Sequence, residues 1–115
     1  MPAQDPAEVT SLEQAFDFST DLPQGWELNL IWTALDRDLI LVSPHADKEA
    51  RAESIPIEAA LTVIRHGLAL GKDLTRLGGR QIGINFEGKI AGNRRIRIKV
   101  GWLDGYTVVT VHRIV

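Results

Sequence analysis

Hydrophobic and polar residues alternate along the C-terminal end of the chain, over residues 93–115. Ile96, Ile98 and Val100 are separated by arginine or lysine, which is the period-two pattern of a β-strand with one buried face. Asp104-Gly105 then interrupts the pattern, and this dipeptide tolerates the positive φ values of a tight hairpin turn. A run rich in β-branched residues follows. The pattern therefore predicts a long β-hairpin.

The register of this hairpin follows from counting outward from a two-residue turn. The predicted cross-strand pairs are Leu103 with Tyr106, Val100 with Val109, Lys99 with Thr110, Ile98 with Val111, and Arg97 with His112. Paired side chains point to the same face of a sheet, so the aliphatic face is expected in the core. The opposite, outward face is basic and rich in hydrogen-bonding groups. It carries Arg95, Arg97, Lys99, Thr110 and His112.

The rest of the chain alternates between helical and extended patterns. We predict a helix over residues 6–17, a hairpin over 26–43, a polar exposed segment over 45–53, an amphipathic helix over 55–70 and a strand over 81–86. With the final hairpin, the order is α-β-β-α-β-β-β, which indicates an α+β fold. We expect an antiparallel sheet of about five strands with one amphipathic helix packed on a face.

Length and composition favour one domain over residues 1–115, with residues 1–5 the stretch expected to be disordered. No apolar run approaches the roughly 20 residues that a membrane span needs, so no membrane association is expected. The first residues lack the basic and apolar regions of a signal peptide. Cysteine is absent, which excludes disulfides and thiolate metal sites and favours a cytoplasmic location.

Charge divides the chain into two unlike halves. Residues 1–62 contain 12 acidic and 3 basic side chains, a net charge of −9, whereas residues 63–115 contain 3 acidic and 10 basic ones, a net charge of +7. Such asymmetry is typical of a protein that binds a charged partner, either another protein or a nucleic acid. The alternative is that the two halves neutralise one another on the surface of a single domain.

The outward face of the final hairpin has the chemistry to handle phosphate. Arginine and lysine bind phosphate oxygens and stabilise charge that develops on them. Histidine is the most common general acid or base, which gives His112 a candidate catalytic role, and Thr110 can add a hydrogen bond. A ribonuclease that works without a metal ion needs about this combination. The alternative is structural, since alternating arginine and lysine also keep an outward strand face soluble.

Residues 55–115 resemble the ribonuclease toxin domains of the barnase, EndoU, colicin E5 and RelE group. The resemblance rests on the helical stretch 57–67, on Gly79-Arg80, and on the two strand patterns over 95–100 and 104–112. Domains of this group place helices before a short antiparallel sheet whose last strands often carry His, Arg and Thr. The resemblance implies RNA cleavage, with His112, Thr110, Arg97 and Arg80 near the site.

Other groups of residues also have functional interpretations. His66, beside Arg65 at the end of the amphipathic helix, suits the helix dipole and would form an acid–base pair with His112 if the two met. Trp26 and Trp32 are expected on one strand face, in the core or, if that face is open, in an interface or homodimer. Metal-ligating groups without a recognised spacing occur at Asp36, Asp38, His45 and Asp47. We therefore predict neither a metal site nor a cofactor.

Two hypotheses follow from these patterns. The first is a small binding or regulatory protein, of the inhibitor or immunity type, that acts without catalysis through charge complementarity on a protein or nucleic-acid partner. The second is a metal-independent ribonuclease of toxin type, with its site on the C-terminal hairpin. In that case His112, Thr110 and Arg97 are the catalytic candidates, and phosphate is bound by Arg95, Arg97, Lys99 and Arg80.

Overall fold

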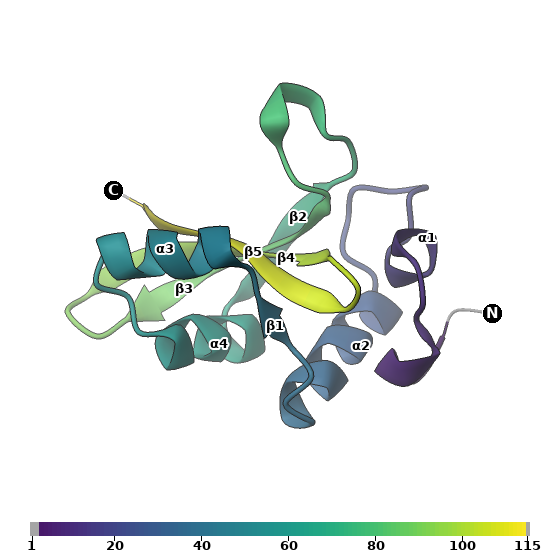
Figure 1. Ribbon diagram of the computed structural model, residues 1–115, viewed down its shortest axis with the longest axis horizontal. Coiled ribbons are helices and arrows are strands. Elements are labelled where there is room, and N and C mark those ends of the chain that lie inside the picture. Colours follow the sequence, from purple (N-terminus) through teal and green to yellow (C-terminus); the bar gives the residue numbers. More distant parts are fainter. Residues whose placement is uncertain (1–2, 115) are drawn as a thin grey trace.

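A five-stranded β-sheet runs through the computed structural model, which describes residues 3–114 (Figure 1). The strands are β1 (Leu41–Val42), β2 (Leu68–Asp73), β3 (Gly83–Ile90), β4 (Arg94–Trp102) and β5 (Tyr106–Ile114). They lie in the order β1-β5-β4-β3-β2. β1 pairs with β5 in parallel, and the other neighbours are antiparallel. The expected α+β fold with about five strands is thus confirmed, although one pairing is parallel.

Helices surround this sheet unevenly. They are η1 (Pro6–Glu8), α1 (Leu12–Ala15), α2 (Gly25–Asp36), α3 (Pro44–Ala52), α4 (Ile57–His66) and the short η2 (Leu77–Gly79). α4 packs on β3 and β4, and α3 lies beside β5, whereas η1, α1 and α2 gather at the other end of the molecule (Figure 1). Aliphatic and aromatic side chains of β3, β4 and β5 form the core together with α2 and α4.

The C-terminal hairpin is present, with a different turn from the one predicted. Trp102 pairs with Tyr106, so the loop has three residues, Leu103 to Gly105, and the predicted pairing of Leu103 with Tyr106 is wrong. Asp104 and Gly105 both have positive φ, at 58° and 151°, as the sequence suggested. Farther along, Val100 pairs with Val108 rather than Val109.

A β-bulge then restores the predicted register. The pairing shifts between Val100 and Lys99, which leaves Val109 as the extra residue on β5. Because the loop and the bulge each add one residue, their effects on register cancel. Lys99 pairs with Thr110, Ile98 with Val111 and Arg97 with His112, as predicted.

The hairpin predicted over residues 26–43 is wrong, because most of this stretch is helix α2. Its buried residues are Glu27, Leu30, Ile31 and Ala34, which have helical spacing. A capping box between Gln24 and Glu27 begins the helix. Only β1 is extended, and it is a short edge strand rather than the predicted central one.

Four other boundaries also differ from prediction. The strand predicted over 81–86 is β3, which begins at Gly83 and continues to Ile90. Residues 6–17 contain η1 and α1 rather than one helix, because the Ser11 hydroxyl accepts from the Gln14 N–H and starts a new turn. The segment 45–53 is largely helix α3, which begins where Ser43 Oγ accepts from the Ala46 N–H at 3.0 Å. The amphipathic helix stops at Gly67, where a Cβ would clash with the Glu87 carbonyl oxygen, and β2 follows at once.

These differences replace the predicted order α-β-β-α-β-β-β by helices α1 and α2, strand β1, helices α3 and α4, and strands β2 to β5. The predicted disorder of residues 1–5 falls partly outside the described residues, at 1 and 2. Within the described part, Asp5 caps η1 by accepting from the Ala7 N–H and pairs with Arg37 at 2.8 Å. No helix within residues 3–114 is both long and apolar enough to cross a membrane.

Candidate functional site

A depression of about 670 Å³ lies over the polar face of β4 and β5. Five of the residues predicted from the sequence line it: Arg80, Arg97, Lys99, Thr110 and His112. Arg95 is outside this lining and pairs instead with Glu87 on β3. The structure therefore brings together four residues from adjacent strands and one, Arg80, from the loop that connects β2 to β3. This loop projects from the sheet in Figure 1.

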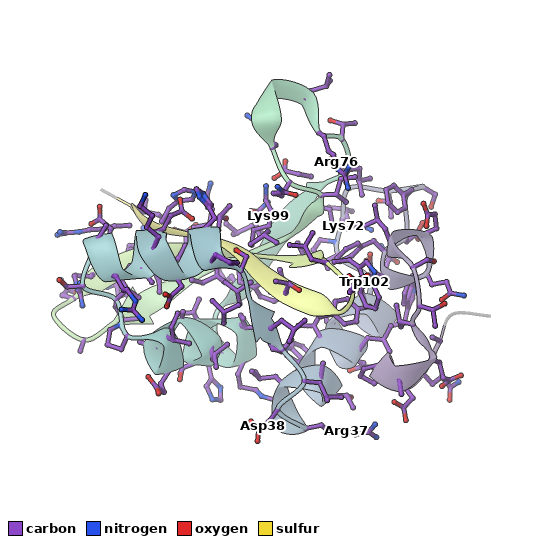
Figure 2. The ribbon with its side chains drawn as sticks, in the orientation of Figure 1. Arg37, Asp38, Lys72, Arg76, Lys99 and Trp102 are labelled. Atoms are coloured by element: carbon purple, nitrogen blue, oxygen red, sulfur yellow. The ribbon has the colours of Figure 1, made fainter. Side chains whose placement is uncertain are left out.

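Lys99 is held firmly at the base of that loop (Figure 2). Its Nζ lies 2.7 Å from Asp73 Oδ2 and 3.0 Å from the Gln81 carbonyl oxygen, and only 8% of its side chain is exposed. Burial opposes ionisation of Asp73, but hydrogen bonds from Lys99 and Asn85, together with the charges of Lys99 and Arg80, hold its pKa below the usual value. Lys99 is thus a fixed positive charge beneath the depression.

Arg97 is a more exposed cation in the same depression. Its guanidinium lies 3.3 Å from Glu87 Oε2, and about half of its side chain, 47%, is exposed. Glu87 also binds Arg95, so a single carboxylate is shared by two guanidinium groups. The described part of this strand face therefore has more positive than negative charge, which suits an anionic ligand.

His112 lies beside a carboxylate that was not among the residues predicted from the sequence. Its Nδ1 lies 3.3 Å from Oε2 of Glu49 on α3, and Oε1 of the same carboxylate accepts from the Val111 N–H at 3.0 Å. β1 pairs with Thr107 and Val108 and then ends, so α3 supplies Val111 with an acceptor. Because Nδ1 faces Glu49, Nε2 is the ring nitrogen of His112 that is left to accept a proton.

His45 is the second imidazole in the depression. It lies in the first turn of α3, four residues before Glu49, and its Nε2 is 3.4 Å from Glu49 Oε1. From the sequence, His45 was expected in a polar exposed segment and was a candidate only as a metal ligand. Ser43-Pro44 is a typical N-cap sequence and was the signal for a helix here. In a helix, His45 and Glu49 are four residues apart and so share a face.

The metal-ligand candidates do not come together. Among residues 3–114, no group of three or more His, Asp or Glu side chains is placed to hold a metal ion. His66 ends α4, which packs on the opposite, apolar side of the sheet, so it does not join His112. Arg65 binds Asp36 and donates to the Trp32 carbonyl oxygen, which is a structural role.

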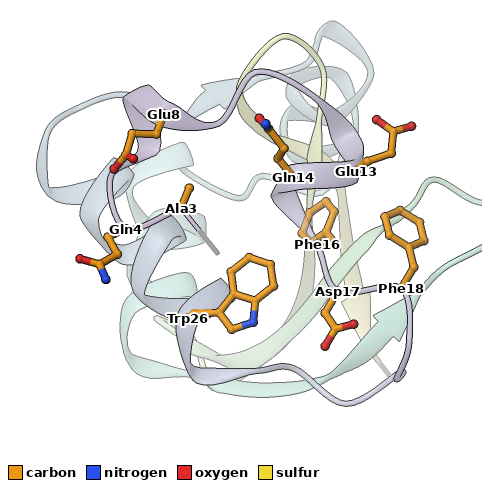
Figure 3. A pocket seen from close by; sticks show the side chains of 9 residues that line it. All are labelled: Ala3, Gln4, Glu8, Glu13, Gln14, Phe16, Asp17, Phe18 and Trp26. Atoms are coloured by element: carbon orange, nitrogen blue, oxygen red, sulfur yellow. The ribbon is translucent and has the colours of Figure 1, made fainter. Parts of the chain in front are cut away.

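A second depression, of about 900 Å³, lies at the other end of the molecule (Figure 3). The carboxylates of Glu8, Glu13 and Asp17 are spaced around the aromatic rings of Phe16 and Trp26 (Figure 3). Hydrogen bonds from the hydroxyl and N–H of Ser19 hold the pKa of Asp17 below its usual value. This end of the chain thus presents negative charge beside apolar surface.

The two tryptophans do not share a face, which corrects the sequence-based expectation. They are six residues apart on α2, and a helix directs such residues to different sides. Trp26 lines the acidic depression, whereas the Trp32 indole N–H donates to the Ile64 carbonyl oxygen at 3.0 Å. Some other acidic residues of the first half are paired within the protein, as Asp5 is with Arg37 and Asp47 is with Arg51.

Comparison of the chain with protein-family models, with curated proteins and with solved structures finds no match.

Proposed function

We propose that this protein cleaves RNA by general acid–base catalysis, without a metal ion. The observation that carries the proposal is the position of His112, whose Nδ1 lies 3.3 Å from Glu49 Oε2 and which shares a depression with Arg97 and Lys99. An imidazole beside cationic side chains is the arrangement that a phosphodiester transfer requires. The weak sequence resemblance to ribonuclease toxin domains agrees with this chemistry.

In the proposed reaction, Nε2 of His112 takes the proton from a ribose 2′-hydroxyl. The 2′-oxygen then forms a bond to the adjacent phosphorus as the bond from phosphorus to the 5′-oxygen breaks. Arg97 and Arg80 bind the phosphate oxygens, on which negative charge increases. Lys99 has two of its three N–H groups engaged by Asp73 and Gln81, which leaves one for a phosphate oxygen. Thr110 adds a neutral hydrogen bond.

The test is incubation of the purified protein with RNA in the presence of EDTA. We expect cleavage by the wild-type chain, and a loss of about 10²–10⁴-fold in the His112→Ala variant. His66→Ala is the matched control, because it removes the imidazole of α4 and leaves the depression intact. Failure of the folded wild-type protein to cleave RNA in any buffer, with or without EDTA, would remove the proposal.

A second candidate function is binding without catalysis, through charge complementarity. The observation that favours it is the acidic depression, which Glu8 and Glu13 line together with Phe18, an aromatic side chain that is 41% exposed. Carboxylates beside apolar rings suit a lysine- or arginine-rich protein segment. The rings can contact the aliphatic parts of such side chains, and the carboxylates can contact their charged ends. On this proposal the protein is an inhibitor-like or regulatory module for a basic partner.

The binding candidate is tested by titrating a Lys/Arg-rich peptide into isotopically labelled protein and following amide shifts. We expect shifts around the acidic depression that weaken as salt is added. They should also weaken in a Glu8→Gln, Glu13→Gln double variant, but not in Glu58→Gln, an exposed carboxylate on α4. Shifts spread evenly over the surface would count against a site there.

A further inference from the structure

We infer that His45 is a second catalytic imidazole, which gives a proton to the 5′-oxygen that leaves during RNA cleavage. This inference rests on the proposed function and goes further, because it assigns the acid as well as the base. The starting observation is that two histidines from distant parts of the chain meet at one carboxylate. His45 comes from α3 and His112 from β5, and both line the depression over the polar face of the sheet.

Glu49 lies close to both imidazoles, with a different carboxylate oxygen near each ring. Oε1 lies 3.4 Å from His45 Nε2, and Oε2 lies 3.3 Å from His112 Nδ1. Each ring therefore has one nitrogen directed to the carboxylate and one nitrogen left for substrate. The shared carboxylate can stabilise the protonated form of either imidazole. The pair is therefore suited to a reaction in which one ring takes up a proton and the other gives one up.

Exposure indicates which imidazole is the acid. His45 is the more exposed of the two, at 69% against 56% for His112, and lies at the rim on the first turn of α3. His112 lies on the strand floor, across from Arg97. The attacking 2′-hydroxyl belongs to the same nucleotide as the bound phosphate, whereas the leaving 5′-oxygen belongs to the next one. The rim imidazole is therefore placed for the leaving group.

The proton transfers balance without another reactant. Neutral His112 accepts the 2′-hydroxyl proton at Nε2, the bond from the 2′-oxygen to phosphorus forms, and the bond from phosphorus to the 5′-oxygen breaks. Protonated His45 gives its Nδ1 proton to that oxygen. The products are a 2′,3′-cyclic phosphate and a free 5′-hydroxyl, and the two imidazoles have exchanged protonation states. The charged groups around this pair are Glu49, Asp73, Arg80, Arg97 and Lys99, with Glu53 and Arg113 on the adjacent side of His112 and Glu49.

The test compares RNA with uridine 3′-(4-nitrophenyl phosphate), whose leaving group departs without being protonated. In His45→Ala we expect kcat for RNA to fall by about 10²–10⁴-fold. Turnover of the nitrophenyl substrate should change by no more than about threefold, because this reaction needs only the base. His112→Ala should lose both reactions, and His66→Ala neither. A second variant, His45→Asn, keeps a polar group at the rim and should behave as His45→Ala does.

The pH profile supplies a further readout that a purely structural role would not change. Wild-type cleavage of RNA should be bell-shaped, because one imidazole must be neutral and the other protonated. His45→Ala should lose the alkaline limb and keep the acid limb. Equal losses on the two substrates, or an unchanged RNA rate, would overturn the assignment of His45 while wild-type cleavage still supports the proposed function. Absence of wild-type cleavage would instead remove the proposed function itself.

Discussion

The Glu27 carboxylate and the Lys72 ammonium form an ion pair whose two side chains are completely buried, with Nζ 3.0 Å from each carboxylate oxygen. Glu27 also accepts from the backbone N–H groups of Asp17 and Gln24, and Lys72 also donates to the Asp17 carbonyl oxygen at 2.6 Å. These contacts connect the start of α2 and the loop before it to strand β2. They join the acidic end of the molecule to the sheet.

Replacing Lys72 by methionine should destabilise the protein by about 3–5 kcal/mol, because it leaves the buried Glu27 carboxylate without its countercharge. The Glu27→Leu, Lys72→Met double variant should be more stable than the sum of the single losses implies. Urea unfolding followed by circular dichroism measures the two single variants, Glu27→Leu and Lys72→Met, and the double variant. Lys48→Met, an exposed lysine on α3, is the control and should change stability by less than about 0.5 kcal/mol. A loss of similar size in that control would contradict the assignment to the buried pair.

Tyr106, the one tyrosine in the chain, should resist ionisation in the folded protein. Its hydroxyl donates to the Ala15 carbonyl oxygen at 2.9 Å, and burial, with a smaller contribution from the Glu27 charge, raises its pKa. The folded state thus holds the phenol proton more tightly than the unfolded state. Stability from this group is complete at lower pH and is lost as pH rises above the ordinary value of 10.0.

An absorbance titration of tyrosinate reports this residue alone. We expect the signal to appear together with loss of the folded circular dichroism spectrum, and not before it. Tyr106→Phe should cost about 1–3 kcal/mol, because the Ala15 carbonyl oxygen loses its donor. Ionisation near the ordinary pKa in a protein that stays folded would show that the phenol is accessible.

Asp73 should make the protein sensitive to acid. Its pKa is lowered in the folded state, so its contribution to stability is present above the ordinary value of 3.8 and is lost as pH falls through the lower folded value. Asp73→Asn removes this dependence, so the variant should be less stable than wild type at neutral pH and the difference should narrow in acid. Urea unfolding over a series of pH values measures it. Parallel curves for the two proteins would contradict the prediction.

Glu49→Gln tests the positioning of His112 separately from the packing of α3. The amide oxygen can still accept from Val111, but it no longer carries the charge that stabilises a proton on the ring. We expect a fall in kcat of at least about 10²-fold with little change in KM. Nitrogen NMR of the imidazoles should show His112 with a changed population of its two tautomers. Glu58→Gln, an exposed carboxylate on α4 away from the site, is the control.

The C-terminal hairpin could be predicted because its signals are local. Alternating residues define two faces, and Asp104-Gly105 fixes the position of the turn within one residue. The bulge at Val109 has no comparable signal in the sequence. The pairing of Arg97 with His112 was nevertheless predicted correctly, because the added loop residue and the bulge offset each other.

The other elements depended on tertiary packing. The spacing of hydrophobic residues over 26–32 fits a helix as well as a strand. The buried carboxylate of Glu27 is stable only because Lys72, far along the chain, pairs with it. α3 buries only Ala46 and Ala50, which are too small to produce a clear hydrophobic stripe. The predicted site was therefore incomplete, because His45 and Glu49 reach it from a helix that the pattern did not indicate.

The position of Glu49 in the candidate site depends on the shortness of β1. Two more residues of edge pairing would satisfy the Val111 N–H with a carbonyl oxygen, and the Glu49 side chain would no longer be drawn to that position. Both imidazoles would then lose the carboxylate that they share, although more of the edge of β5 would be hydrogen-bonded to β1. Because the pairing between β1 and β5 stops at Val108, the Val111 N–H is left to donate to the carboxylate of Glu49 on α3.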